Sequence, residues 1–124
     1  MKTIVIVEDD PDIQDLIEAI FSMDSRFCVA RMVESAEEAI DVVRASGAEI
    51  IVLDHGLRGV LSGLAAAQQL KDLAPQAKII MFTAHAEIEA QTRRDPAIDG
   101  FLLKDEATRL LPLAQQMTKM LGFA

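Results

Sequence analysis

Apolar residues in this chain gather in five short runs, and longer segments with a helical period separate them. The runs recur about every 20 to 28 residues, which is the pitch of a strand plus a crossover helix. Three runs are continuously apolar, as expected for central strands that are buried on both faces of a parallel sheet. The pattern therefore predicts five strands: TIVIV from Thr3, FCVARMV from Phe27, IIVL from Ile50, KIIMF from Lys78 and FLL from Phe101.

The first intervening segment shows the clearest helical pattern. Pro11 stands where the first turn of a helix tolerates proline. The apolar residues that follow fall at positions i, i+3, i+4, i+7 and i+8, which places them on one face of a helix that packs on the core. These residues are Ile13, Leu16, Ile17, Ile20 and Phe21.

Two further helices are marked by their ends. Ser35 and Glu38 have the spacing of a capping box, so a second helix is expected to begin there. A third helix is predicted from about Ser62 to Leu73, before Pro75. The apolar face of the second helix consists of Ala36, Ala39, Ile40 and Val43.

The last two helices are less regular. From about Ala86 to Arg94 the one large apolar residue is Ile88, so the fourth helix is weakly anchored, and mobile elements are where switches tend to be built. Pro112 would remove a hydrogen bond inside a helix, so the fifth helix is expected to begin late, near 108 to 111. Its apolar stripe is Leu110, Leu113, Ala114, Met117 and Leu121, with Gly122 as its end.

This alternation predicts a single domain over residues 1–124 with a doubly wound α/β fold around a five-stranded parallel sheet. In such sheets, ligands bind at the carboxyl ends of the strands, beside the point where the strand order reverses. The residues that follow each strand are therefore the candidates for function.

Composition and charge exclude several classes of function. The chain is 51% hydrophobic and 26% charged, and none of its apolar runs approaches the roughly 18 residues that span a bilayer. Its start lacks the pattern of a signal peptide, so a cytoplasmic location is the default expectation. The net charge of −8 argues against direct binding of nucleic acid. Cys28 has no partner for an internal disulfide and is expected to be a buried small hydrophobe.

Polar residues suited to chemistry stand at four strand ends. If the first and third strands are neighbours, Glu8, Asp9 and Asp54 meet in one cleft, where their repulsion raises a pKa unless a cation joins them. Mg²⁺ fits, because it takes one or two carboxylates and keeps waters that phosphate oxygens can replace. Gly56 could add a backbone carbonyl without a side chain in the way. The strand-end residues are Glu8, Asp9 and Asp10, then Asp54, Thr83 and Lys104.

This set of residues suits phosphoryl transfer. A carboxylate beside Mg²⁺ can attack phosphorus and form an acyl phosphate, and Asp54 is the candidate. Lys104 would supply a fixed positive charge to the transferred group, and Thr83 a hydroxyl that donates to one of its oxygens. Three strand ends would thus contribute three separate roles.

These motifs resemble the receiver domain of two-component response regulators, and the resemblance covers nearly the whole chain. IVIVEDDPDI is similar to the family's opening strand and acidic pair, IIVLDHGL to its phosphoacceptor strand, KIIMFTA to its Thr/Ser strand and GFLLKD to its Lys strand. Four such pieces in order, with suitable spacing, make a specific signal. The resemblance implies a flavodoxin-like (βα)5 fold with strand order 2-1-3-4-5.

The resemblance also assigns roles to individual residues. It implies that Asp54 is the phosphoacceptor and that Thr83 and Lys104 form the phosphate-sensing pair. Asp10 is then a helix N-terminal acid. The implied Mg²⁺ ligands are Glu8, Asp9 as a direct ligand, Asp54 and the carbonyl of Gly56.

A conformational switch and its partners follow from the same resemblance. The Thr83 hydroxyl would move toward the phosphoryl group and let Phe101 turn inward. Phe101 has no hydroxyl, so it would signal by packing. The implied phosphodonor is a sensor histidine kinase or a histidine phosphotransfer protein. Output would reach a downstream protein through the face of helix 4, strand 5 and helix 5, and a phosphorylation-dependent dimer is one form such a switch can take. No contact with nucleic acid or membrane is expected.

Two segments depart from the family pattern. Arg58 stands where the family usually has proline, and Gly63 comes one residue later than usual. Arg58 is therefore either a solvated cation on a changed loop or a contact to the phosphoryl group or the donor kinase. The stretch from Thr83 to Lys104 is about one residue short, which affects the surface that partners would read.

Two other functions remain open from the sequence. Haloacid-dehalogenase phosphatases also use an Asp nucleophile with Mg²⁺, but they need an acid two residues on, where this chain has Gly56. A phosphoryl group on Asp54 should therefore persist, so a switch with at most autophosphatase activity is expected rather than an enzyme. The other alternative is a receiver-like interaction module that is never phosphorylated.

The two histidines and the chain end complete the expectations. His55 and His85 show no spacing of a metal pair, and no Pro-Cys-x-x-Cys follows HAE, so both are expected to be loop residues rather than zinc ligands. A minor hypothesis is that His85 limits the access of water to an aspartyl phosphate. The chain stops after the fifth helix, which fits either a stand-alone receiver or a fragment of a larger regulator.

Overall fold

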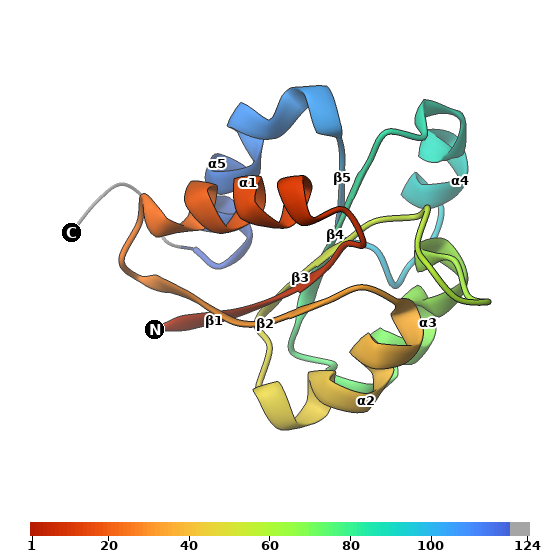
Figure 1. Ribbon diagram of the computed structural model, residues 1–124, viewed down its shortest axis with the longest axis horizontal. Helices are drawn as coiled ribbons and strands as arrows, with labels where there is room; N and C mark the ends of the chain where they lie inside the picture. Colours follow the sequence, from red (N-terminus) through yellow and green to blue (C-terminus); the bar gives the residue numbers. More distant parts are fainter. Residues whose placement is uncertain (120–124) are drawn as a thin grey trace.

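The computed structural model describes residues 1–119, in which five parallel strands alternate with five α-helices (Figure 1). The strand order is β2-β1-β3-β4-β5, so the predicted fold class and strand order are confirmed. Each predicted strand is present within one residue at either end. The strands are β1 (Lys2–Val7), β2 (Phe27–Val33), β3 (Ile50–Leu53), β4 (Lys78–Thr83) and β5 (Gly100–Leu103).

The helices cover both faces of this sheet (Figure 1). Helices α1 and α5 pack on one face, and α2 and α3 pack on the other. Neighbouring strand residues alternate between the two cores, so that Ile4 and Ile6 contact the first layer and Val5 and Val7 the second. The helices are α1 (Pro11–Ser22), α2 (Ala36–Ser46), α3 (Gly63–Leu73), α4 (Glu89–Arg93) and α5 (Leu110–Met117).

Side-chain caps fix the helix starts, largely as predicted. Ser62 accepts a hydrogen bond from the backbone N–H of Ala65 and starts α3. Ser35 accepts from the N–H of Glu38 at 3.1 Å and starts α2. The reciprocal bond of the capping box is shifted, because the Glu38 carboxylate accepts from the N–H of Glu34, one residue before the cap.

The two irregular helices behave as their sequences indicate. The fourth is a 3₁₀ turn at Ala86–Ile88 followed by the five-residue α4, and Ile88 is its large buried residue. The fifth begins at Leu110, after a 3₁₀ segment at Lys104–Arg109, so that Pro112 falls in the first turn. The predicted late start is therefore confirmed, whereas Leu121 and Gly122 lie outside the described residues.

Two predicted core residues are exposed instead. Leu16 of α1 is 39% exposed, because α1 buries only the stripe that contains Ile17, Ile20 and Phe21. The expectation that Cys28 is buried is also wrong. Within the described part of the chain, Cys28 lies on the edge strand β2, which pairs with β1 alone, and the helices do not cover the middle of this strand. Among residues 1–119, no helix combines the length and apolar character needed to cross a bilayer.

Candidate functional site

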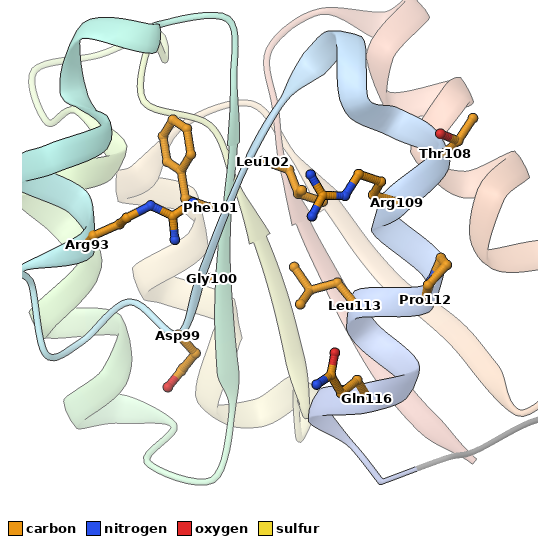
Figure 2. A pocket seen from close by; sticks show the side chains of 10 residues that line it. All are labelled: Arg93, Asp99, Gly100, Phe101, Leu102, Thr108, Arg109, Pro112, Leu113 and Gln116. Atoms are coloured by element: carbon orange, nitrogen blue, oxygen red, sulfur yellow. The ribbon is translucent and has the colours of Figure 1, made fainter.

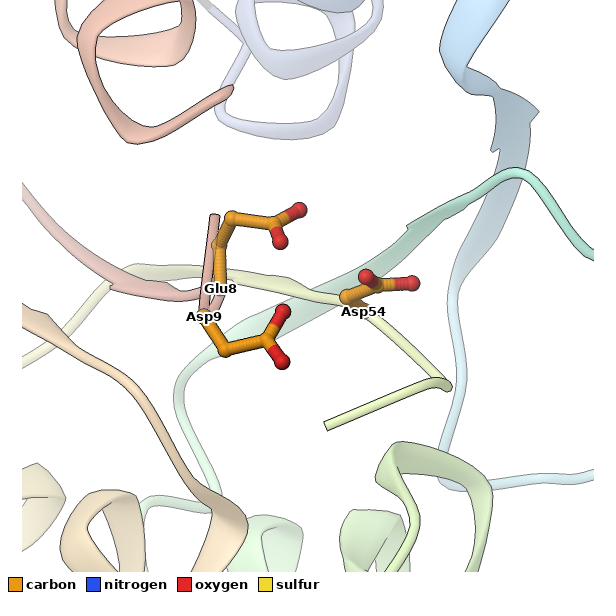
Figure 3. Close-up of side chains that lie close together, drawn as sticks. All are labelled: Glu8, Asp9 and Asp54. Carbon is orange, nitrogen blue, oxygen red and sulfur yellow. The ribbon is translucent and has the colours of Figure 1, made fainter. Parts of the chain in front are cut away.

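The candidate site is an acidic cluster at the carboxyl ends of β1 and β3 (Figure 3). Strands β1 and β3 pair in register, with Val7 opposite Leu53, so that Glu8, Asp9 and Asp54 leave the sheet together. One carboxylate oxygen from each of the three lies within 4.8 Å of the others. Glu8 and Asp54 are 1% and 4% exposed. The predicted meeting of these three carboxylates is confirmed.

Lys104 supplies a cation to this cluster from the end of β5. Its Nζ lies 2.8 Å from Oε1 of Glu8 and 2.9 Å from Oδ2 of Asp54. The lysine stem is itself largely buried, with 21% of the side chain exposed. One ammonium group therefore bridges two buried carboxylates, while Asp9 stands beside them at the more open side of the cluster.

The pKa values of Glu8 and Lys104 are both raised, for different reasons. Burial raises the pKa of Glu8, against the hydrogen bonds it accepts from Lys104 and from the backbone of Asp10, and the charge of Asp54 raises it further. Burial by itself would lower the pKa of Lys104, but its hydrogen bonds to Glu8 and Asp54 outweigh burial and raise it. The lysine is thus held charged, and it leaves Glu8 incompletely compensated.

The donor set fits a hard divalent cation. Three carboxylates within ligand distance of each other, two of them buried, carry more negative charge than one ammonium group neutralises. Carboxylate and carbonyl oxygens are the ligands that Mg²⁺ prefers, and a second cation would relieve the raised pKa of Glu8. Glu8, Asp9 and Asp54 could therefore hold such a cation.

The backbone around Asp54 holds its carboxylate in place. The N–H of His55 donates to Oδ1 of Asp54 at 2.7 Å, while Lys104 holds Oδ2. Helix α3 begins at Gly63 against the carbonyl of Asp54, where a Cβ would collide with the backbone. The N–H of Gly63 also donates to the carbonyl of His55. Gly63 is thus required by close backbone contact at the phosphoacceptor candidate, although it comes late in the family pattern.

Thr83 and Phe101 stand on the neighbouring strands. Thr83 ends β4, is fully buried, and its Oγ1 accepts from the N–H of His85 at 3.3 Å. The hydroxyl keeps its proton for donation to another acceptor. Phe101 of β5 is 6% exposed and belongs to the core beside α2 and α3, and the guanidinium of Arg93 lies 5.8 Å from its ring centroid. The aromatic ring therefore has the inward position in this structure.

The loop after Asp54 is tied to the start of α2. Arg58 forms an ion pair with Glu34 at 3.5 Å, and the backbones of Arg58 and Ser35 form a short parallel bridge. Oε2 of Glu37 accepts from the N–H groups of Val60 and Leu61 at 3.0 and 3.1 Å. A contact of Arg58 with a phosphoryl group stays a prediction, since its guanidinium is engaged at this ion pair.

Sequence reasoning missed Glu37. Its carboxylate also occupies the place where a Cβ of Gly59 would lie, and Gly59 has a φ of +88° that suits glycine. Nothing in the local pattern links a helix residue to a loop more than 20 residues away.

His85 covers the loop on the other side. Its Nε2 lies 2.7 Å from the place where a Cβ on Gly56 would stand, so glycine leaves room for this ring. The rings of His85 and His55 meet edge to face with centroids 5.4 Å apart, and Nδ1 of His85 is 3.0 Å from Glu87. Both histidines are in loops, as predicted.

Comparisons with known proteins find relatives of this chain. The family model described as response regulator receiver domain matches residues 4–115. The nitrate/nitrite response regulator protein homolog of Haemophilus influenzae is 31% identical over 103 residues, which cover 82% of this chain and 49% of that protein. The transcriptional regulatory protein ComA of Bacillus subtilis is 29% identical over 90 residues, or 72% of this chain and 42% of that protein. The chain thus spans less than half the length of these relatives.

Solved structures show the same fold. The isolated REC domain of RcsB from Salmonella enterica serovar Typhimurium, solved in the presence of phosphomimetic BeF3⁻, has a TM-score of 0.85 at 20% identity and covers 99% of this chain and 91% of that one. The response regulator protein TrrA from Thermotoga maritima, solved in complex with Mg²⁺ and BeF, has a TM-score of 0.77 at 25% identity and covers 92% and 99%.

Proposed function

Since this chain belongs to the response regulator receiver domains, we propose that it is a switch that accepts a phosphoryl group on Asp54 from a histidine kinase or a histidine phosphotransfer protein. The observation that carries this proposal is the position of Lys104, whose Nζ bridges Asp54 and Glu8 beside Asp9. A buried nucleophile, a fixed cation and a cation site at one sheet edge are the components that acyl phosphate formation needs.

In the proposed reaction, a carboxylate oxygen of Asp54 attacks the phosphorus of a phosphohistidine. The new P–O bond forms as the P–N bond breaks, and the electron pair of the P–N bond stays with the imidazole, which is then protonated by solvent. The carboxylate is held on one oxygen by the N–H of His55 and on the other by Lys104, which reduces the reorganisation required.

Other residues would bind and retain the product. Lys104 exchanges one carboxylate contact for a phosphoryl oxygen, and Thr83 donates its hydroxyl to another. Mg²⁺, when bound, would neutralise charge on the phosphoryl oxygens. The proposed ligands of that ion are Glu8, Asp9, Asp54 and the carbonyl of Gly56.

We expect a signal rather than turnover. The position two residues after Asp54 is Gly56, which offers no acid to activate water or a leaving group. The cluster also favours this switch over a module that is never phosphorylated. Placing a largely buried lysine between two buried acids carries a desolvation cost that the packing of an interaction module does not require.

The proposed output surface is the face formed by α4, β5 and α5. It contains Phe101 and a hollow between α4 and α5 (Figure 2). Packing changes at Phe101 would alter this surface directly, because β5 forms its floor. A downstream protein, or a second phosphorylated copy, would read the change there.

Binding of beryllofluoride, a phosphoryl mimic, tests this proposal. With Mg²⁺, beryllofluoride should shift the amide resonances of Asp54, Thr83, Phe101 and Lys104 in two-dimensional NMR spectra. The response should vanish in Asp54→Ala and persist in Asp41→Asn, which changes an exposed acid on α2. No response in the parent chain, or an equal response in Asp54→Ala, would favour the interaction module that takes no phosphate.

A further inference from the structure

A hollow of about 360 Å³ lies over β5, between α4 and the start of α5 (Figure 2). β5 is an edge strand, so no further strand covers it among residues 1–119. The residues that line the hollow are Arg93, Asp99, Gly100, Phe101, Leu102, Thr108, Arg109, Pro112, Leu113 and Gln116.

Two arginines approach this hollow from opposite sides of β5 (Figure 2). Arg93 comes from α4 and Arg109 from the segment before α5, and their side chains are 58% and 68% exposed. Each is paired with a glutamate on its own helical turn, Glu89 or Glu106, at 2.9 and 2.8 Å. Exposed local pairs of this kind contribute little stability, so a ligand carboxylate can replace them.

Both arginines act on the carboxylate of Glu106. The pKa of Glu106 lies below its usual value, first because its carboxylate accepts the N–H of Leu103, then because of Arg109, and the charge of Arg93 adds to this. A carboxylate at this side of the hollow therefore interacts with both arginines. In a chain of net charge −8, such convergence of two cations is a local departure from the overall field.

Asp99, the acidic residue of the lining, already has hydrogen-bond partners. Oδ2 of Asp99 accepts from Nζ of Lys71 at 2.7 Å and from the N–H of Ile79 at 2.9 Å. Asp99 and Lys71 thus cancel each other at the lower end of the hollow. The other charged residues of the lining are the two arginines, whose glutamate partners lie outside the lining.

The floor and one wall of the hollow are apolar. β5 forms the floor, from which Phe101 points toward α4 and Leu102 toward α5 (Figure 2). Leu113 and the exposed Pro112 form the wall beside α5. Gly100 leaves the floor low, because a Cβ there would approach the ends of Met117 and Leu113. A ligand that fits both parts combines a carboxylate with an apolar neighbour.

We propose that this hollow binds an acidic segment of the downstream partner, with an Asp or Glu carboxylate between Arg93 and Arg109 and an adjacent apolar side chain on Leu113 and Pro112. The assignment rests on the proposed function, in which this face carries the output. Beyond that function, it specifies that the partner presents an acidic segment. Because the Arg93 guanidinium also lies over the Phe101 ring, a ligand that draws Arg93 away changes the cover of the switch residue.

A second copy of this chain is the less suitable occupant. Among the residues that line the hollow, the acid that a second copy could bring is Asp99, which Lys71 and the N–H of Ile79 already engage. An acidic segment of a different protein has the complementary charge.

The test is a titration of the full chain with blocked tetrapeptides, followed by two-dimensional NMR. Acetyl-Leu-Glu-Glu-Leu-amide should shift the amide signals of Gly100, Leu102 and Leu113, and the shifts should weaken as salt is added. The Gln and Lys versions of the peptide should bind at least about tenfold more weakly. Equal binding of the Gln peptide, or shifts confined to other surfaces, would overturn the assignment. Concentration-dependent dimerisation through this face in place of peptide binding would also overturn it.

Alanine variants distinguish direct contacts of the peptide with Arg93 and Arg109 from a general effect of positive charge. Arg109→Ala and Arg93→Ala should each weaken the Glu peptide about fivefold to tenfold. Arg94→Ala makes the same change one residue away, outside the lining, and should leave binding within about twofold. Equal losses in all three variants would indicate a nonspecific charge effect and refute the site.

Asp54→Ala distinguishes this inference from the proposed function. Binding of the Glu peptide to the resting form should survive in Asp54→Ala, with the same dependence on Arg109. If that result is obtained while beryllofluoride fails to bind the parent chain, the acidic-segment site stands and the phosphoryl switch fails. If beryllofluoride binds and the Glu peptide does not, only the acidic-segment site fails.

Discussion

Lys104 and Asp54 lie 50 residues apart in the sequence, and their side chains meet with 2.9 Å between Nζ and Oδ2. The same Nζ lies 2.8 Å from Glu8, so three strand ends are joined by one ammonium group. This contact gives Lys104 two tasks. In the resting protein it compensates buried acids, and in the proposed phosphorylated form it holds the phosphoryl group.

Removal of the lysine should therefore destabilise the resting protein. Lys104→Ala leaves Glu8 and Asp54 buried without their cation, and we expect a loss of about 2 to 3 kcal/mol in the free energy of unfolding, reduced from fully buried cases by its partial exposure. Urea unfolding at neutral pH measures this loss. Mg²⁺ should restore more stability to Lys104→Ala than to the parent chain. A variant as stable as the parent would show that the bridge makes no net contribution.

The raised pKa of Glu8 predicts a dependence of stability on pH. Folding raises this pKa above 4.5, so between the two values the folded state binds more protons than the unfolded state. The contribution of Glu8 to stability consequently falls as pH rises from 4.5 through its folded pKa. Glu8→Gln has no ionisable side chain at this position, so it does not lose stability in this way as pH rises.

We expect Glu8→Gln to be more stable than the parent at pH 7 without Mg²⁺, with the difference shrinking below pH 4.5. Thermal unfolding across this range measures the difference. Mg²⁺ should narrow it at pH 7, because the parent chain alone keeps the full set of carboxylates. A parent chain that stays more stable at pH 7 would contradict the assigned direction.

The Glu37 clamp predicts a local effect. Glu37→Ala removes the acceptor for the N–H groups of Val60 and Leu61, so hydrogen exchange at these two amides should accelerate, with a stability loss of about 1 kcal/mol. Arg58→Ala is the matched change on the same loop, and it should cost less than about 0.5 kcal/mol, since its pair with Glu34 is long and exposed. Unchanged exchange at Val60 and Leu61 would show that another contact holds the loop.

Phosphorylation kinetics of Arg58→Ala decide the open hypothesis for this residue. With its guanidinium engaged at Glu34, we expect unchanged rates from acetyl phosphate and an unchanged lifetime of the aspartyl phosphate. A slower reaction from acetyl phosphate would show contact with the phosphoryl group. A slower reaction from the kinase alone would show contact with the donor protein.

His85 and Gly56 predict a change in the lifetime of the aspartyl phosphate. If the His85 ring limits access of water to Asp54, His85→Ala should shorten that lifetime. Gly56→Ala should act in the same direction. Its Cβ would lie only 2.7 Å from Nε2 of His85, so the His85 ring would have to move away. Decay of the phosphorylated protein, followed on gels that separate the two forms, measures both. Lifetimes equal to the parent's would refute the role in water exclusion.

The sequence predicted the fold well because periodicity is a local property. Continuous apolar runs marked the central strands β3 and β4, and Pro112 marked the late start of α5. Burial on the outer strand was predicted less well. Cys28 is exposed because β2 lies at the edge of the sheet, and the position of a strand in the sheet is decided by topology. Leu16 of α1 is exposed because it lies beside the stripe of this helix that faces the core.

Some features of the candidate site could be predicted from the sequence and others could not. The convergence of Glu8, Asp54 and Lys104 followed from the rule that parallel strands bring their carboxyl ends to one edge. The Glu37 clamp and the packing of His85 on Gly56 did not follow from it. Both depend on the path of loops, which the spacing of residues along the chain does not determine.

The central claim is that Asp54 accepts the phosphoryl group, and mapping of the modified residue tests it most directly. The chain is incubated with acetyl phosphate and Mg²⁺, the acyl phosphate is trapped by borohydride reduction, and peptides are analysed by mass spectrometry. Our account predicts a reduced residue at position 54 that is absent without Mg²⁺ and in Asp54→Asn. Modification at another acid, or none in a chain that remains folded and binds Mg²⁺, would contradict it.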